Sequence, residues 1–93
     1  MKLPVDYNLL TPIERRDVRN EYVKEQNGRC WFCQSQLICD PSDDVKNKKI
    51  TRKLFPRNFF KWPIHLHHDH NTGMTIGAVH AKCNAVLWQY YNE

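Results

Sequence analysis

Residues 64–84 read Ile-His-Leu-His-His-Asp-His-Asn-Thr-Gly-Met-Thr-Ile-Gly-Ala-Val-His-Ala-Lys-Cys-Asn. All five histidines of the 93-residue chain fall within this stretch, and they are His65, His67, His68, His70 and His80. Histidine titrates near neutral pH and is the commonest metal ligand in proteins. The presence of all five histidines in one stretch favours a metal or catalytic site over a histidine-rich surface loop with incidental metal affinity.

The same stretch predicts a strand, a turn, a second strand and a helix. Residues 63–67 alternate apolar and polar side chains, as a half-buried strand does. Residues 69–73 are rich in Asp, Asn and Gly, which suit a tight reversal of the chain. Residues 75–79 are β-branched and apolar, and Gly77 indicates a bulge or a close backbone approach. From Ala81 onward the apolar residues follow a helical spacing.

Two residue pairs predict a closed zinc site. Cys30 and Cys33 form a Cys-x-x-Cys pair, and His80 and Cys83 form a His-x-x-Cys pair. Together they offer the four ligands of a tetrahedral structural zinc site. The sequence leaves two alternatives open. One is a disulfide between Cys30 and Cys33, which a thiol-preserving setting disfavours, and the other is Cys39 in place of His80 as the fourth ligand.

Upstream, the sequence predicts an extended arm at residues 1–10 and a helix at residues 11–27. Thr11 suits the helix N-cap, Pro12 suits the first turn, and Glu14 completes a capping box. Gly28 suits a left-handed C-cap. The helix residues expected to face the core are Ile13, Val18, Tyr22 and Val23. The arginines expected on a solvated face, in slight preference to contacting phosphate, are Arg15, Arg16 and Arg19.

Positive charge is concentrated in the first two thirds of the chain. The net charge is +4 and the pI is near 9.0, and all but one of the 14 lysines and arginines precede Trp62. Residues 46–61 contain no acidic residue, which predicts contact with nucleic-acid phosphates. The aromatic residues of this stretch are expected mainly to seal the small core. The cations assigned to DNA binding are Lys46, Lys48, Lys49, Arg52, Lys53, Arg57 and Lys61.

Three motifs together resemble the HNH, or ββα-metal, endonucleases. They are residues 28–33 (Gly-Arg-Cys-Trp-Phe-Cys), residues 65–73 (His-Leu-His-His-Asp-His-Asn-Thr-Gly) and residues 80–84 (His-Ala-Lys-Cys-Asn). They look most like the branch of the phage recombination endonuclease VII, which joins the nuclease motif to a zinc knuckle. The chain departs from that branch at His67, where Asp is usual, and at His80, where Cys is usual.

The resemblance implies a small α+β fold in which a structural zinc knuckle staples a ββα-metal (His-Me finger) core behind an N-terminal helix. Residues 1–93 would form one domain, as the short chain also requires. Within it the knuckle would be residues 28–34 and 80–83, the basic loop residues 40–62 and the core residues 64–91. The chain starts without a signal-peptide pattern, so we expect a cytoplasmic location, in a bacterial host if the protein is phage-encoded. We expect no membrane contact, because no apolar run reaches spanning length.

The resemblance also implies roles in metal-dependent hydrolysis of DNA. His68 would be the general base that activates water. His67 and Asn84 would bind a catalytic divalent metal, namely Mg²⁺, Mn²⁺ or Ni²⁺. His70 would bind the metal or a phosphate. Asp69 would orient a histidine or bind the metal directly.

His65 has no role in this scheme and is expected to be a packed strand residue. The alternative to an enzyme is a non-catalytic zinc module that binds nucleic acid or protein, including a phage-type inhibitor or adaptor built on an inactive nuclease. The set His67, His68 and Asn84 favours the enzyme, because a binding module has no use for a base beside an open metal site. DNA is the expected partner.

Overall fold

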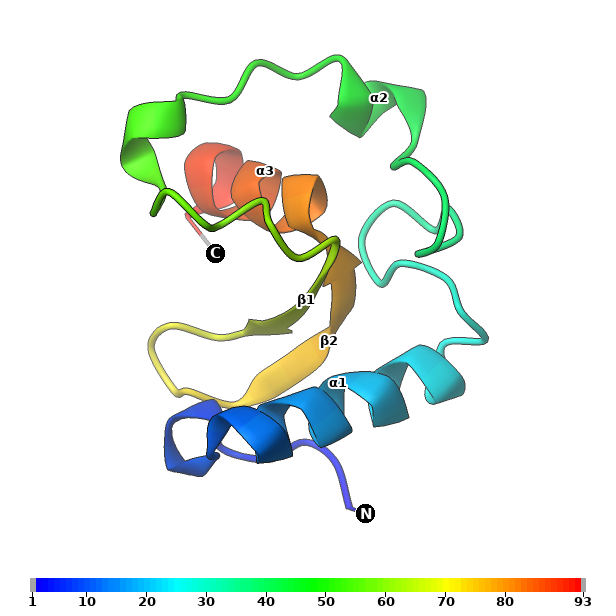
Figure 1. Ribbon diagram of the computed structural model, residues 1–93, viewed down its shortest axis with the longest axis vertical. Helices are drawn as coiled ribbons and strands as arrows, with labels where there is room; N and C mark the ends of the chain where they lie inside the picture. Colours follow the sequence, from blue (N-terminus) through cyan, green and yellow to red (C-terminus); the bar gives the residue numbers. More distant parts are fainter. Residues whose placement is uncertain (1, 93) are drawn as a thin grey trace.

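A two-stranded antiparallel sheet stands between two helices in the computed structural model, which describes residues 2–92 (Figure 1). The strands are β1 (Ile64–His68) and β2 (Thr75–His80), and the long helices are α1 (Pro12–Glu25) and α3 (Ala81–Tyr91). The short elements are η1 (Tyr7–Leu9), α2 (Asp43–Lys46) and η2 (Arg52–Leu54). The predicted α+β class and the order strand, strand, helix are therefore confirmed.

Helix α1 begins as its sequence predicts. The Thr11 hydroxyl accepts a hydrogen bond from the Glu14 amide at 3.2 Å, and the Glu14 carboxylate accepts one from the Thr11 amide at 2.9 Å. Val18 and Tyr22 are buried, but the prediction for Ile13 is wrong, because this side chain is 64% exposed. Ile13 precedes Val18 by five residues, which places it about 140° away around a helix that turns 100° per residue.

The β1–β2 hairpin turns at residues 69–74. His67 pairs with Gly77, and the register shifts between His67 and His68. A Cβ atom added to Gly77 would lie 2.8 Å from the Gln26 side chain and 3.0 Å from Trp31. Because Gly77 has no side chain, Gln26 (before the knuckle) and Trp31 (within it) can approach β2 closely. A close backbone approach is one of the two roles that a glycine in a strand predicts.

The outer edge of β2 is covered by other parts of the chain. The Gln26 side chain donates to the Ala78 carbonyl at 2.9 Å and accepts from the Ala78 amide at 2.8 Å. Nearer the turn, the Thr75 amide donates to the Val5 carbonyl, and the Tyr7 amide donates to the Gly73 carbonyl. The N-terminal arm thus completes this edge of the sheet, which brings Tyr7 close to the end of β1.

The core lies where α1, the hairpin and α3 meet. Its largest fully buried apolar side chains are Cys30, Val79, Cys83, Val86 and Leu87. Residues 43–62 arch over α3 (Figure 1), and Gln89 and Tyr90 hold this segment through hydrogen bonds to the backbone of Lys49 and Thr51. Over the described residues, every helix is too short or too polar to cross a membrane.

Candidate metal centre and active-site pocket

Four side chains converge on one point between the knuckle and the start of α3. The ligand atoms of Cys30, Cys33, His80 and Cys83 all lie within 4.8 Å of one another. His80 Nδ1 lies 3.5 Å from Cys33 Sγ and 3.6 Å from Cys83 Sγ. Ligands bound to zinc at about 2.0–2.3 Å in a tetrahedron are separated by roughly 3.3–3.8 Å. This Cys₃His group can therefore hold a metal ion such as zinc.

The backbone fixes which nitrogen of His80 faces the cluster. His80 Nε2 lies 2.9 Å from the Gln36 carbonyl and 3.0 Å from the Cys39 carbonyl. Carbonyl oxygens only accept hydrogen bonds, so Nε2 carries the proton and Nδ1 keeps its lone pair for a metal. Cys39 contributes its carbonyl, while its thiol is exposed and lies outside the cluster. The structure thus supports His80 over Cys39 as the fourth ligand.

The thiols of the cluster are free, and two of them, Cys30 and Cys83, shift each other's pKa. Cys83 donates a hydrogen bond that lowers the pKa of Cys30, while the same contact and burial raise the pKa of Cys83. Placing two thiolates side by side in a buried site requires a compensating cation. A divalent metal provides that compensation, because it binds the thiolate forms and releases their protons.

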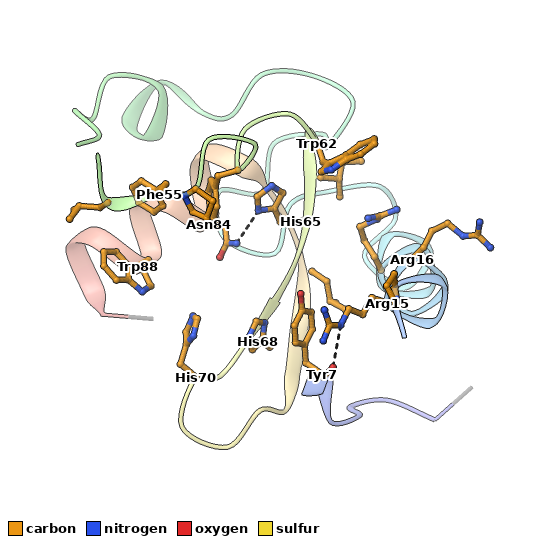
Figure 2. A pocket seen from close by; sticks show the side chains of 17 residues that line it. Tyr7, Arg15, Arg16, Phe55, Trp62, His65, His68, His70, Asn84 and Trp88 are labelled. Atoms are coloured by element: carbon orange, nitrogen blue, oxygen red, sulfur yellow. Dashed lines mark hydrogen bonds between the residues drawn. The ribbon is translucent and has the colours of Figure 1, made fainter. Parts of the chain in front are cut away.

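A second site opens along β1, and it is called the active-site pocket here because it contains the candidate catalytic residues His68, His70 and Asn84. Its volume is about 550 Å³, within the range of about 300–1,000 Å³ that is usual for ligand sites. Figure 2 shows His68 and His70 at one end, His65 and Asn84 in the middle, and Tyr7 with the arginines of α1 along one side. The polar side chains that line the pocket are Tyr7, Arg15, Arg16, Arg19, His65, His68, His70 and Asn84.

His68 is held by ring stacking. Its ring lies parallel to that of Tyr7 with centroids 3.8 Å apart, and the Arg15 guanidinium lies 4.0 Å from the Tyr7 ring centroid. Nδ1 of His68 is buried, so Nε2 is the ring nitrogen available to a ligand. Burial lowers the pKa of His68, with smaller contributions from His70 and Arg15. His68 is therefore a neutral imidazole at pH 7 and can accept a proton.

Asn84 is oriented by a residue that the sequence left without a role. Its Nδ2 donates to His65 Nδ1 at 3.1 Å, which turns the amide oxygen towards the pocket (Figure 2). This bond requires His65 to be neutral, and burial lowers the pKa of His65 accordingly. An amide oxygen fixed in this way is a suitable ligand for a hard or borderline cation.

Two of the predicted site residues are placed elsewhere. His67 does not line the pocket: it is 1% exposed, and its ring centroid lies 5.5 Å from that of Trp31. The expected role of His67 as a metal ligand beside Asn84 stays a prediction, and the histidine that contacts Asn84 in the structure is His65. The role of Asp69 in orienting a histidine stays a prediction, and its carboxylate accepts hydrogen bonds from the amides of Asn71 and Thr72. These bonds lower the pKa of Asp69 and stabilise the turn.

The basic loop forms a smaller cationic pocket of about 410 Å³. Its cations are Lys48, Lys49, Arg52 and Lys82. Arg52 lies over Phe60 at 4.2 Å, and Lys48 lies over Tyr90 at 5.1 Å. Lys46 instead pairs with Asp40 at 3.3 Å. The remaining predicted cations, which are Lys53, Arg57 and Lys61, are exposed.

Sequence reasoning missed Tyr7, His65 and the arginines as residues of the active-site pocket. For the arginines a signal was present, because Arg15 and Arg19 are four residues apart and share one face of a helix. For His65 the alternation of the strand gave no such signal, because it groups His65 with His67, which does not line the pocket. The contact of Tyr7 with His68 joins the arm to a strand 61 positions later, and no local pattern encodes it.

No protein-family model, curated protein or solved structure matches this chain. The function is therefore inferred from the residues and geometry described above.

Proposed function

We propose that the protein is an endonuclease that hydrolyses DNA phosphodiester bonds with the help of a divalent metal. The observation that carries this proposal is the content of one pocket. A neutral imidazole (His68), an oriented amide oxygen (Asn84) and a cationic helix face all border the same space. Hydrolysis of a phosphodiester needs a base for water, a site for a charge-neutralising metal, and cations for the flanking phosphates.

His68 acts as the general base in this mechanism. Its Nε2 takes a proton from a water molecule, and the resulting hydroxide oxygen bonds to phosphorus as the bond to the 3′ oxygen breaks. The leaving oxygen takes up a proton from solvent. Tyr7 and Arg15 keep the imidazole in one orientation through the ring stack, so the base does not need to be ordered when the substrate binds.

Asn84 and His70 are the residues that would hold the catalytic metal. Their donors, an amide oxygen and an imidazole, suit Mg²⁺, Mn²⁺ or Ni²⁺. A divalent cation bound there would neutralise negative charge on the phosphate and stabilise the leaving oxygen. His70 is exposed, and its ring centroid lies 4.8 Å from that of His68. His65 is a positioning residue, since it acts by holding the Asn84 amide.

The Cys₃His group has a separate, structural role in this proposal. Zinc bound there would join the knuckle after α1 to the junction of β2 and α3. Asn84 follows Cys83 directly, so zinc bound to Cys83 would also fix the start of the helix that carries Asn84. The active-site pocket and the zinc site are thus linked through the first turn of α3.

A plasmid-nicking assay with Mg²⁺, Mn²⁺ or Ni²⁺ tests the proposal. His68→Ala should lower the nicking rate by about 10²–10⁴, the usual contribution of a general base. His68→Phe is the matched variant, because it retains a ring to stack on Tyr7 and lacks a proton acceptor. Both variants should keep the zinc content and circular dichroism of the wild type. Equal nicking by wild type and His68→Phe would remove His68 from the mechanism, and no nicking with any metal would favour the binding-module alternative.

A further inference from the structure

The side of the active-site pocket opposite α1 is aromatic. Figure 2 shows Phe55 and Trp88 on that side, across the pocket from Arg15 and Arg16. The Phe55 ring packs edge-on against Trp88 with centroids 5.6 Å apart, and it is tilted against Phe59 with centroids 4.8 Å apart. This side of the pocket, here called the aromatic wall, is therefore a packed cluster in which Trp88 is held against Phe55.

Two large apolar side chains of this wall are exposed at the pocket. Trp88 is 42% exposed and Leu54 is 48% exposed, whereas Phe55 and Phe59 are half-buried. Phe59 already covers part of the neighbouring strand, since it lies edge-on to the His65 ring with centroids 4.6 Å apart. Exposed apolar surface gathered at a hollow indicates a surface that a ligand covers.

Trp88 follows Asn84 by four residues in α3, so the two side chains lie on one face of the helix, one turn apart. A flat group resting on Trp88 would thus lie about one helical turn from the oriented Asn84 amide. The other side of the pocket carries Arg15, Arg16 and Arg19. Of these three arginines, only Arg16 forms an ion pair with a residue that the structure describes. Its partner is the exposed Asp17, at 3.2 Å.

This combination of a flat apolar surface and cations matches the chemistry of a nucleotide. Phosphates pair with guanidinium groups, and a base stacks on an indole ring through its flat face. In a paired duplex both faces of each base are covered by neighbouring bases. Only an unpaired nucleotide, in a single strand, a bulge or a flap, offers a free base to Trp88 while its phosphates reach α1.

We propose that the active-site pocket recognises an unpaired nucleotide of a DNA strand, with its base on Trp88 and its flanking phosphates on Arg15 and Arg16. This inference rests on the proposed hydrolytic function and narrows its substrate class to DNA with unpaired positions. Trp88 is then a specificity-determining residue. It contacts the base beside the cleaved bond and takes no part in the bond-breaking step.

Binding measured without added divalent metal separates recognition from hydrolysis. The probes are a fluorescent single-stranded DNA oligonucleotide, the same strand in a fully paired duplex, and a duplex with one unpaired nucleotide. Zinc-loaded wild type should bind the single strand and the bulged duplex at least tenfold more tightly than the paired duplex at one salt concentration. Trp88→Leu should lose about tenfold in affinity for the single strand and for the bulged duplex, the size of one base–aromatic stack, and change little in affinity for the paired duplex.

Tyr91→Leu is the matched control on the same helix. Tyr91 is 52% exposed and lies outside the pocket, so its replacement should leave all three affinities unchanged. Leucine keeps apolar packing against Phe55, and thermal unfolding would confirm that Trp88→Leu is folded. Equal affinity of the wild type for the three DNA probes, or unchanged binding by folded Trp88→Leu, would overturn the inference. Tighter binding of an RNA strand of the same sequence would overturn the choice of DNA.

A cleavage arm with added Mn²⁺ distinguishes the two proposals. Cutting of the paired duplex at the same rate as the bulged duplex would leave hydrolysis standing and overturn recognition of unpaired nucleotides. Selective binding of the single strand without cutting in Mg²⁺, Mn²⁺ or Ni²⁺ would support recognition and overturn the nuclease.

Discussion

The Cys₃His cluster and the active-site pocket use the same part of the chain in opposite ways. Both take side chains from the hairpin and the first turn of α3, and both contain imidazole. In the cluster, Cys30 and Cys83 are fully buried and His80 is tied to backbone carbonyls through its second nitrogen. In the pocket, His70 is exposed and Nε2 of His68 has been left for a ligand. A closed donor set suits a structural ion, and an open one suits exchange of water and substrate.

The comparison also separates two ways of fixing a histidine. His80 is fixed by hydrogen bonds to carbonyls, which define its tautomer and leave one nitrogen for a metal. His68 is fixed by stacking on Tyr7, which sets the plane of the ring, and only its Nδ1 is buried, so Nε2 stays available to exchange a proton. The first arrangement favours permanent coordination, and the second favours proton transfer.

The largest expected effect is loss of the fold on removing a cluster thiol. Closed zinc sites contribute about 10–16 kcal/mol of apparent binding energy, which matches or exceeds the whole stability of an ordinary domain. Cys83→Ser should therefore lose its zinc and its cooperative thermal unfolding transition. Elemental analysis and circular dichroism would measure both. Cys39→Ser is the control, because that thiol is exposed outside the cluster, and a Cys83→Ser protein as stable as this control would contradict a structural metal.

A smaller effect is expected from releasing the Asn84 amide. His65→Ala removes the acceptor of the Asn84 hydrogen bond, so the amide oxygen is no longer fixed towards the pocket. Losing a group that orients a ligand usually costs about 10–100-fold in metal affinity. The Mn²⁺ concentration for half-maximal nicking should rise by that factor, with the maximal rate largely retained. His65→Gln offers another hydrogen-bond acceptor and should recover part of the lost metal affinity. If folded His65→Ala needs the same Mn²⁺ concentration for half-maximal nicking as the wild type, His65 does not position Asn84.

The sequence predicts the Cys₃His cluster and the order of helices and strands more accurately than it predicts the residues of the active-site pocket. Cys30, Cys33, His80 and Cys83 are paired at short spacings, so local chemistry specifies them. Likewise, Asp, Asn and Gly specify the turn, and Thr11 specifies the start of α1. The pocket instead depends on which side of an irregular strand each histidine faces. The register shift between His67 and His68 changes which side of the sheet His68 faces. No residue type in the sequence predicts where such a shift occurs.

Long-range contacts account for the remaining differences. Tyr7 reaches His68 because the arm pairs with the end of β2, and Trp88 meets Phe55 because residues 43–62 arch over α3. Each contact joins segments that are far apart in the sequence. The resemblance to HNH endonucleases predicts that His68 and Asn84 belong to one site, and both line the active-site pocket. The resemblance gives no indication that an aromatic wall and an arginine-bearing helix complete that site.

The pH dependence of nicking should distinguish the open site from the closed one. Burial, His70 and Arg15 lower the pKa of His68 below the 6.5 of an ordinary imidazole. Only the neutral ring accepts a proton from water, so activity should be present above this lowered pKa and be lost as pH falls through it. Below the pKa, the rate should drop about tenfold per pH unit. Zinc content measured at each pH controls for loss of the cluster, and a decline centred above pH 6.5 with zinc retained would contradict the assignment.

The smallest expected effect concerns the cations of the basic loop, which are open to solvent and lie outside the lining of the active-site pocket. Each cation that contacts a phosphate releases counterions, so its loss lowers the slope of log affinity against log salt by about 0.7–0.9. Lys48→Gln with Lys49→Gln should therefore weaken DNA binding about threefold per cation at low salt and flatten the slope, equally for unrelated sequences. Lys2→Gln with Lys24→Gln removes the same charge from elsewhere on the chain. Binding curves across a salt series would measure both variants. If net charge alone attracted DNA, the two double variants would lose affinity equally, whereas a larger loss for the loop variant would place the phosphates at the cationic pocket beside Lys48 and Lys49.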